Sequence, residues 1–385
     1  MPTAFAALLI LLVAPCLSGQ TPARWNLEPE LRIGGADADP HYELNPIREI
    51  AIGPDGSIYV TQAGDQALRV FDAQGKYLRT IGRKGEGPGE FTGLGGVGFI
   101  GDTLYVTDFR QRRITLFRPD GTLISTIVAE PAPSGPARPD AYFRPTPSTL
   151  LSDGSVFAGS SFPSHLVSSG QIKARPVFRV TRTAAVLDTI AWVPIGSGQG
   201  TMQSGNATMF FSQPVPDDPM TVIAGPSERV FVIERGAGQG STSFNVTAID
   251  ASGDTLWSRS HTYRPKAFAA GVVDSIVDVQ VRRFSSGPNE KTRFSADQVR
   301  KALHIPDHQV TVTQAFAAMD GSLWLRREEF GATLNWTVLD PKGNVVATFG
   351  LPRNVRPMTV IGDQAWGVEL DDVDVPQLVR YRIRK

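Results

Sequence analysis

The feature that most constrains the fold is a short turn-and-strand segment that recurs six times along the 385-residue chain. In five copies an Asp-Gly or Gly-Asp pair stands directly before a strand of apolar and aromatic residues. Glycine accepts a positive φ angle and aspartate bonds nearby backbone amides, so such pairs close tight hairpins. The copies begin 42 to 93 residues apart, and they are Asp55–Val60, Gly101–Val106, Asp153–Ala158, Ser227–Val232, Asp320–Leu325 and Gly362–Gly367.

Two further strands follow each of these segments, and they are clearest over Leu68–Ile81 and Ile114–Ile127. Apolar residues alternate there with a period of two, which places them on one face of a strand. A four-stranded meander cannot bury both of its faces alone, whereas several meanders packed around an axis can. We therefore predict an all-β fold, a six-bladed β-propeller of four-stranded blades that occupies residues 24–385.

The two ends of the chain predict how the ring closes. The last repeat stops at Lys385 after its third strand, so its blade lacks a fourth strand. The segment Trp25–Ile33 has the pattern of an unpaired fourth strand. Pairing the two removes an exposed sheet edge, and we expect this N-terminal strand to close the propeller.

One segment, at about residues 266–305, departs from the β pattern. Apolar residues recur at helical spacing from Phe268 to Phe284. A second helix is predicted to begin at Ser295, which forms a capping box with Gln298, and to end before Pro306. We predict a small helical insertion between blades four and five that lies beside one face and partly covers it.

The N-terminus predicts export. The first 23 residues carry no charged side chain, and Phe5–Ala14 is an apolar run with the length of a signal-peptide core. That run is too short to span a bilayer, which takes about 20 apolar residues. We expect residues 1–19 to be a signal peptide and the mature protein to be periplasmic or extracellular, with no transmembrane segment. The alternative is lipoprotein anchoring through Cys16, although Pro15 departs from the small residue expected before a lipidated cysteine.

The charge balance bears on partners. The chain has 38 basic and 38 acidic residues and no long basic run. The electrostatic footprint of a nucleic-acid-binding protein is therefore missing. We expect a monomer that does not bind nucleic acid.

Three segments of the first two repeats carry a family resemblance: Ile81–Phe91, Asp102–Asp108 and Arg113–Phe117. They resemble NHL-repeat propellers and, more closely, bacterial exported six-bladed β-propeller proteins. The resemblance covers residues 47 to 127 well and the other blades only through their turn-and-strand pattern. It implies a propeller fold and export. It leaves the function open, because such propellers include binding modules and a few enzymes.

Propeller geometry predicts where a site lies. First strands line the central channel, and antiparallel pairing brings their starts to the same face as the ends of second strands. Arginine there suits carboxylates or phosphates, because guanidinium donates two parallel hydrogen bonds. The alternatives are that each arginine pairs with a neighbouring acid and that Asp108 bonds backbone amides of its own turn. The candidate ligand-binding residues at this channel mouth are Arg48, Glu49, Asp108, Arg110, Arg144, Glu234, Arg326 and Arg356.

The sequence contains no acid–base or metal-ligand constellation that identifies a reaction, so we assign no catalytic residue, metal ligand or cofactor. We expect a non-catalytic binding module of the cell envelope that presents a charge-rich face to a protein, a peptide or a small anionic ligand. The alternative is a metal-dependent propeller hydrolase or lyase of the lactonase or esterase kind. Such an enzyme holds Ca²⁺ in the channel with several carboxylates.

Overall fold

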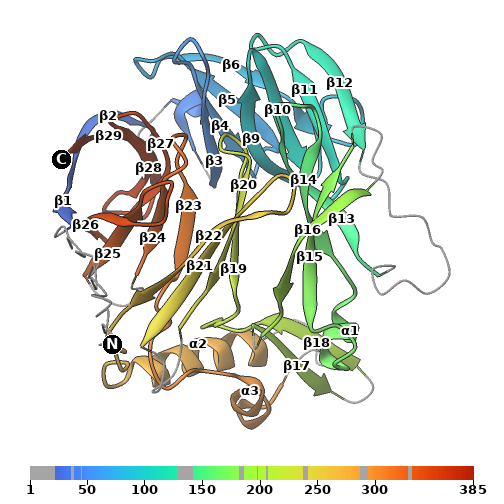
Figure 1. The fold of residues 1–385 in the computed structure, drawn as a ribbon, viewed down its shortest axis with the longest axis vertical. Helices are drawn as coiled ribbons and strands as arrows, with labels where there is room; N and C mark the ends of the chain where they lie inside the picture. The colour runs from blue at the N-terminus through green and yellow to red at the C-terminus, as the bar shows by residue number, and fades with distance from the viewer. Residues whose placement is uncertain are drawn as a thin grey trace, which may run out of the picture.

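Six four-stranded blades form a closed ring, which confirms the predicted six-bladed β-propeller (Figure 1). The computed structural model describes residues 22–385 apart from 36–38, 45, 129–141, 182–185, 197, 205–206, 237–241, 287–293 and 328–331. The expected signal peptide at 1–19 and Cys16 lie outside these residues. No helix in the described ranges combines the length and the apolar character needed to cross a bilayer.

The first three blades follow the chain in order. Blade one contains β3 (Ile47–Ile52), β4 (Ile58–Gln62), β5 (Ala67–Phe71) and β6 (Tyr77–Ile81). Blade two contains β9 (Leu94–Ile100), β10 (Thr103–Asp108), β11 (Arg113–Phe117) and β12 (Leu123–Val128). Blade three contains β13 (Arg144–Leu150), β14 (Val156–Ser161), β15 (Ala174–Val180) and β16 (Val186–Pro194). The short strands β7 (Arg83–Lys84) and β8 (Glu90–Phe91) join blades one and two.

The last three blades complete the ring. Blade four contains β19 (Met220–Ala224), β20 (Arg229–Glu234), β21 (Ser243–Asp250) and β22 (Thr255–Thr262). Blade five contains β23 (Gln314–Ala317), β24 (Leu323–Arg326), β25 (Thr333–Leu339) and β26 (Val345–Pro352), with β1 (Ala23–Arg24) parallel to β26. Blade six contains β27 (Val355–Ile361), β28 (Gln364–Leu370), β29 (Pro376–Arg384) and β2 (Asn26–Ile33). Neighbouring first strands contact one another around the whole ring, so they enclose the central channel.

The Asp-Gly turns have the geometry that the sequence predicts. In the first copy, Oδ1 of Asp55 accepts a hydrogen bond from the amide of Ser57 at 3.0 Å, and Gly56 has a φ of 81°. The copy in blade three repeats this arrangement, with a donor–acceptor distance of 2.8 Å and a φ of 81° at Gly154. A side chain at such a φ would be strained, which explains the glycine in these turns.

The N-terminal strand closes the ring as predicted. β2 pairs antiparallel with β29, from Asn26 opposite Arg384 to Ile33 opposite Leu378. Opposite charges face each other across this pair: Glu28 lies 2.8 Å from Arg384, and Glu30 lies 2.8 Å from Arg382. Apolar burial supplies most of the closure energy, since exposed ion pairs each contribute only about 0–1 kcal/mol.

Apolar contacts between neighbouring blades form the core. Trp324 and Trp336 of blade five are buried against Val355 and Val360 of blade six. Trp366 of blade six packs with apolar residues of blade one. The tryptophans that follow the turn segments therefore stabilise the ring.

The predicted helical insertion is present between blades four and five, as α2 (Val272–Ser285) and α3 (Ala296–Ala302). The capping box of Ser295 and Gln298 begins α3. The sequence did not predict its partner, a hairpin of β17 (Gln199–Ser204) and β18 (Ala207–Ser212) between blades three and four. A small core joins hairpin and helices, and its buried members are Met202, Phe211, Phe284, Phe294 and Val299.

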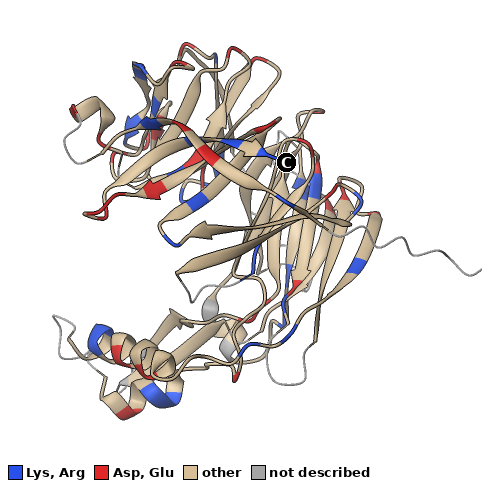
Figure 2. Ribbon diagram, turned by 90° about the vertical axis from the view of Figure 1, so that its left-hand side faces the viewer, with Lys and Arg blue, Asp and Glu red and all other residues tan. Residues whose placement is uncertain are grey.

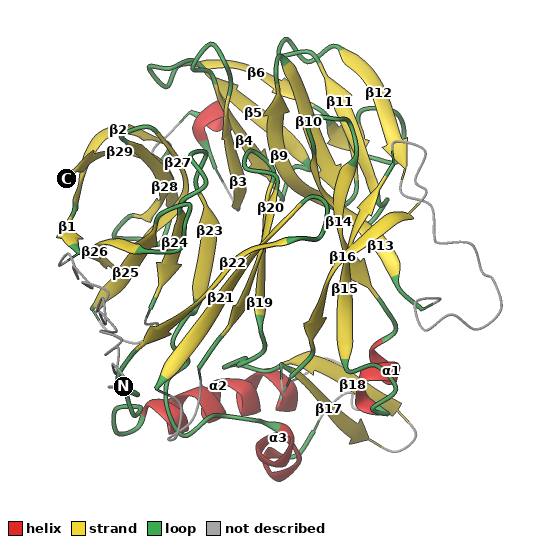
Figure 3. Ribbon diagram, in the orientation of Figure 1, coloured by secondary structure: helices red, strands yellow, loops and turns green. Residues whose placement is uncertain are grey.

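The insertion occupies one face of the propeller. Strands alternate in direction within each blade. The starts of the first strands therefore lie on the same face as the ends of the second and fourth strands, and we call this face the insertion face. It carries α2, α3, the β17–β18 hairpin and α1 (Ser164–Ser168), grouped at the lower end of the molecule in Figure 3. The Asp-Gly turns lie on the opposite, or turn, face. A single-turn 3-10 helix, Pro40–Tyr42, precedes blade one.

Candidate functional site

A cavity of about 550 Å³ occupies the central channel, and the first strands of all six blades line it. A cavity of this size falls within the ~300–1,000 Å³ range of small-molecule sites. The residues that line it include charged, hydroxyl-bearing and apolar side chains from blades far apart in the sequence. The channel is therefore the natural place to examine the predicted site residues.

The inner strand of blade two widens the channel. β9 contains three glycines, Gly95, Gly96 and Gly98, all of which line the cavity. A Cβ at Gly95 would lie 2.5 Å from Oγ1 of Thr107, and one at Gly98 would lie 2.4 Å from the hydroxyl of Tyr105. Close packing therefore requires these two glycines, whereas a Cβ at Gly96 would meet its nearest neighbour at 3.4 Å.

Two of the predicted residues, Arg48 and Glu49, line the cavity near the insertion face. The guanidinium of Arg48 lies over the ring of Phe109, 5.1 Å from its centroid, a distance at which a cation–π contact forms. Arg356 reaches from blade six to blade one, where its Nη2 donates to the carbonyl oxygen of Ile47 at 3.3 Å. Both arginines lie close enough for their charges to act on the Glu49 carboxyl, and of the two Arg48 is among the residues that line the cavity whereas Arg356 is not.

The carboxyl of Glu49 has an unusual environment. Its side chain is exposed, but to the channel, and protein surrounds that channel. This removal from bulk water raises the pKa of Glu49 to about 7, although the positive charges of Arg356 and Arg48 oppose the rise. The backbone amide of Glu49 donates to Oγ1 of Thr61 at 2.8 Å, which fixes this part of β3. Glu49 therefore changes charge near neutral pH.

Asp108 has a structural role. Its side chain is fully buried, and its carboxylate accepts hydrogen bonds from the amides of Thr92, Arg110 and Gln111 at 2.8–2.9 Å. Burial raises the pKa of Asp108, but the hydrogen bonds from Gln111, Thr92 and neighbouring amides outweigh it and lower the pKa below its usual value. The carboxylate of Asp108 therefore bonds backbone amides in and beside its own turn. This is the alternative to ligand binding that the sequence offered for this residue.

Like Asp108 and Arg356, the remaining four candidates are not among the residues that line the cavity. Arg144 and Glu234 are exposed at strand ends, and Glu234 accepts from the side-chain amide of Asn245 at 3.1 Å. Nε of Arg326 donates to Oγ1 of Thr313 at 2.9 Å. Arg110 packs its stem against Gly93. The structure therefore brings together two groups of the eight: Arg48, Glu49 and Arg356 at the channel, and Asp108 with the amide of Arg110 in its own turn.

Hydroxyl groups of the channel wall were not foreseen from the sequence. Tyr105 and Thr149 are both buried, and their hydroxyls lie 2.7 Å apart. Oγ1 of Thr221 is buried with no hydrogen-bond partner among the described residues. Threonine is common in strands for its shape alone, so no sequence signal distinguishes a threonine that faces the channel.

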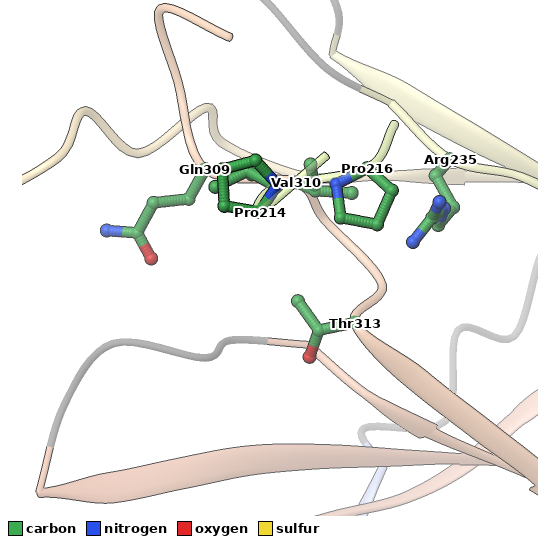
Figure 4. A pocket seen from close by; sticks show the side chains of 7 residues that line it. Pro214, Pro216, Arg235, Gln309, Val310 and Thr313 are labelled. Atoms are coloured by element: carbon green, nitrogen blue, oxygen red, sulfur yellow. The ribbon is translucent and has the colours of Figure 1, made fainter. Parts of the chain in front are cut away.

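Two smaller features lie near the insertion. A pocket of about 130 Å³ is lined by Pro214, Pro216, Arg235, Val310 and Thr313, with Gln309 at its edge (Figure 4). Arg235 is held there by hydrogen bonds to the carbonyl oxygens of Asp218 and Val312. A second cavity, of about 550 Å³, lies between Pro214 and the Val272–Val279 side of α2.

Charge is spread over the molecule, with basic and acidic residues interspersed on the blades and on α2 and α3 (Figure 2). Within the described ranges, no group of three or more His, Cys, Asp and Glu residues is arranged to hold a metal ion. The channel mouth combines opposite charges instead, and two fixed guanidinium groups there suit an anion.

Comparison with known proteins supports the fold. A sequence family described as a 6-bladed beta-propeller (DUF5128) matches residues 41–130, which span the first two blades. No curated protein sequence matches the chain. A structure of a DUF4221 member from Bacteroides vulgatus has 11% identity and a TM-score of 0.50, over 95% of this chain and 100% of that chain.

Two other solved structures are more distant. A protein of Bacteroides fragilis named as exported has 12% identity and a TM-score of 0.48, over 95% of this chain and 97% of that chain. A gluconolactonase from Xanthomonas campestris has 12% identity and a TM-score of 0.42, over 95% and 99%. At such identities these likenesses concern the fold alone.

Proposed function

We propose that this protein is an exported, non-catalytic binding propeller of the cell envelope that takes a small anionic ligand at the charged end of its central channel. The observation that carries the proposal is the placement of Arg48 and Arg356 beside Glu49, next to a cavity of about 550 Å³. Export rests on the N-terminal sequence, because residues 1–19 lie outside the described structure.

The geometry favours an anion over a cation for two reasons. Two guanidinium groups always carry charge, whereas the single carboxyl of Glu49, with a pKa of about 7, is only partly ionised at neutral pH. The cation–π contact with Phe109 holds Arg48 in place, so less side-chain entropy is lost on binding. The charged end of the channel therefore keeps a net positive charge.

The proposal is tested by titrating the mature protein with carboxylates and inorganic phosphate in a calorimeter. Arg48→Ala and Arg356→Ala are each expected to weaken binding roughly 10- to 100-fold, because hydrogen bonds to charged groups contribute about 1.5–3 kcal/mol. Arg353→Ala is the matched control, since Arg353 is exposed on the connection between β26 and β27 and is not one of the charges that act on Glu49. Equal losses in all three variants, or no binding by the wild type, would exclude this site.

A second candidate function is a hydrolase or lyase that uses the same channel. One observation favours it: a carboxyl with a pKa of about 7 suits general acid–base catalysis at neutral pH. Metal analysis of the purified protein and assays with lactone and ester substrates test it. Turnover that disappears in Glu49→Gln would support the enzyme, and a metal-free protein without turnover would leave the binding module.

A further inference from the structure

The channel changes polarity from one end to the other. Near the insertion face its wall carries Arg48 and Glu49, from the start of β3. Near the turn face the same strand ends in Ile52, and the neighbouring wall is apolar, with Phe99, Met319 and Ile361. A molecule that fills the channel therefore meets charge at one end and apolar surface at the other.

The dimensions of the channel fit an elongated ligand. The five residues from Arg48 to Ile52 span about 13 Å, at ~3.3 Å per residue of strand. Gly96 lines the middle of the channel and has no side chain to narrow it, and a Cβ added there would lie 3.4 Å from the carbonyl oxygen of Ser148. Met319 lines the cavity at this far end and is 46% exposed.

The charges define the head group of such a ligand. Arg48 and Arg356 together outweigh an ionised Glu49 by one positive charge. A single negative charge neutralises this excess, whereas a second negative charge would lie close to the Glu49 carboxylate, and Arg48 is the one cation among the described residues that line the cavity. A planar carboxylate also matches guanidinium in a bidentate arrangement.

We infer that the channel binds an amphipathic monoanion, namely a straight-chain aliphatic carboxylate. Its head group lies at Arg48 and Arg356, and its tail runs along the channel past Gly96 toward Met319. This inference rests on the proposed anion site and adds the chemical class of the ligand. The apolar end of the channel removes the tail from bulk water. Each methylene that is removed from water adds to the binding free energy, so the affinity depends on chain length.

The test is a calorimetric series of acetate, hexanoate and decanoate with the mature protein. We expect the dissociation constant to fall roughly three- to fourfold for each added methylene that enters the channel, until the chain fills it. Binding that is equal for acetate and decanoate would overturn this inference and leave the proposed anion site standing. Failure of every carboxylate to bind would overturn this inference, and failure of inorganic phosphate as well would overturn the proposed anion site.

Two further measurements separate the head group from the tail. Decanol shares the tail but lacks the charge, and binding of decanol as tight as that of decanoate would overturn the head-group assignment. Met319→Asp puts a charge at the apolar end, and it is expected to weaken decanoate at least tenfold while acetate is unchanged. The matched control is Leu123→Asp, at a residue that is 40% exposed on β12 outside the channel, and an equal loss of decanoate binding in this control would also overturn the tail assignment.

Discussion

Replacing Glu49 with glutamine tests the electrostatics of the proposed site most directly. The substitution keeps the size of the side chain and removes its titration near pH 7. The charged and titratable groups around it are Arg48, Arg356 and the hydroxyl of Tyr105. The pKa of Glu49 is about 7, so we expect the pH dependence of binding between pH 6 and 8.5 to arise from this carboxyl.

The magnitude follows from Coulomb's law. Two unit charges about 4 Å apart interact by ~1 kcal/mol in water and ~4 kcal/mol at a protein surface. The channel is open to water but lies inside the ring, so we take about 2 kcal/mol for a bound carboxylate beside ionised Glu49. This repulsion would raise the pKa of Glu49 in the complex by about 1.5 units. Affinity of the wild type should then fall about 15-fold from pH 6 to pH 8.5.

The assay is calorimetric titration with decanoate across this pH range. Glu49→Gln is expected to bind with nearly constant affinity, close to that of the wild type at pH 6, and therefore about 15-fold more tightly than the wild type at pH 8.5. Glu43→Gln is the matched control, because Glu43 is exposed just before β3 and does not line the cavity. If Glu49→Gln keeps the pH slope of the wild type, Glu49 does not face the bound anion and the reasoning fails.

Two predictions concern the scaffold. Ile33 joins the closing strand to blade one, since it is 3% exposed and packs in the same cluster as Trp366. Ile33→Ala should lower the free energy of unfolding by about 2–5 kcal/mol in denaturant titrations. The exposed control Leu123→Ala should cost under about 0.5 kcal/mol, and equal losses would refute a closing role. Asp108→Asn should cost about 1–3 kcal/mol, because it weakens a buried acceptor of several amides. The lowered pKa of Asp108 means that this stability is present above its unfolded pKa of 3.8 and is lost as pH falls through the folded pKa; an unchanged acid limb of the stability curve in the variant would contradict this.

Local sequence patterns determined most of the fold. The Asp-Gly turns, the strand that follows each and the capping box at Ser295 depend on residues only a few positions apart. The role of Asp108 was also accessible, because its partners Arg110 and Gln111 follow it directly and Thr92 lies 16 residues before it. The closing strand was predictable because the last repeat has only three strands and the N-terminal strand has no partner of its own near it in the sequence.

The tertiary structure alone decided the composition of the site. Arg356 and Glu49 lie close together only because ring closure brings blade six against blade one. A contact between positions so far apart in the chain leaves no repeating pattern in the sequence. The sequence offered eight charged candidates at strand ends, but second-strand ends lie farther from the axis than first strands, so Glu234 and Arg326 do not line the cavity. The channel that Glu49 lines is formed by the first strands of all six blades. The sequence therefore specifies the blades through local turns and alternation, whereas the packing of the ring determines which charges share the channel.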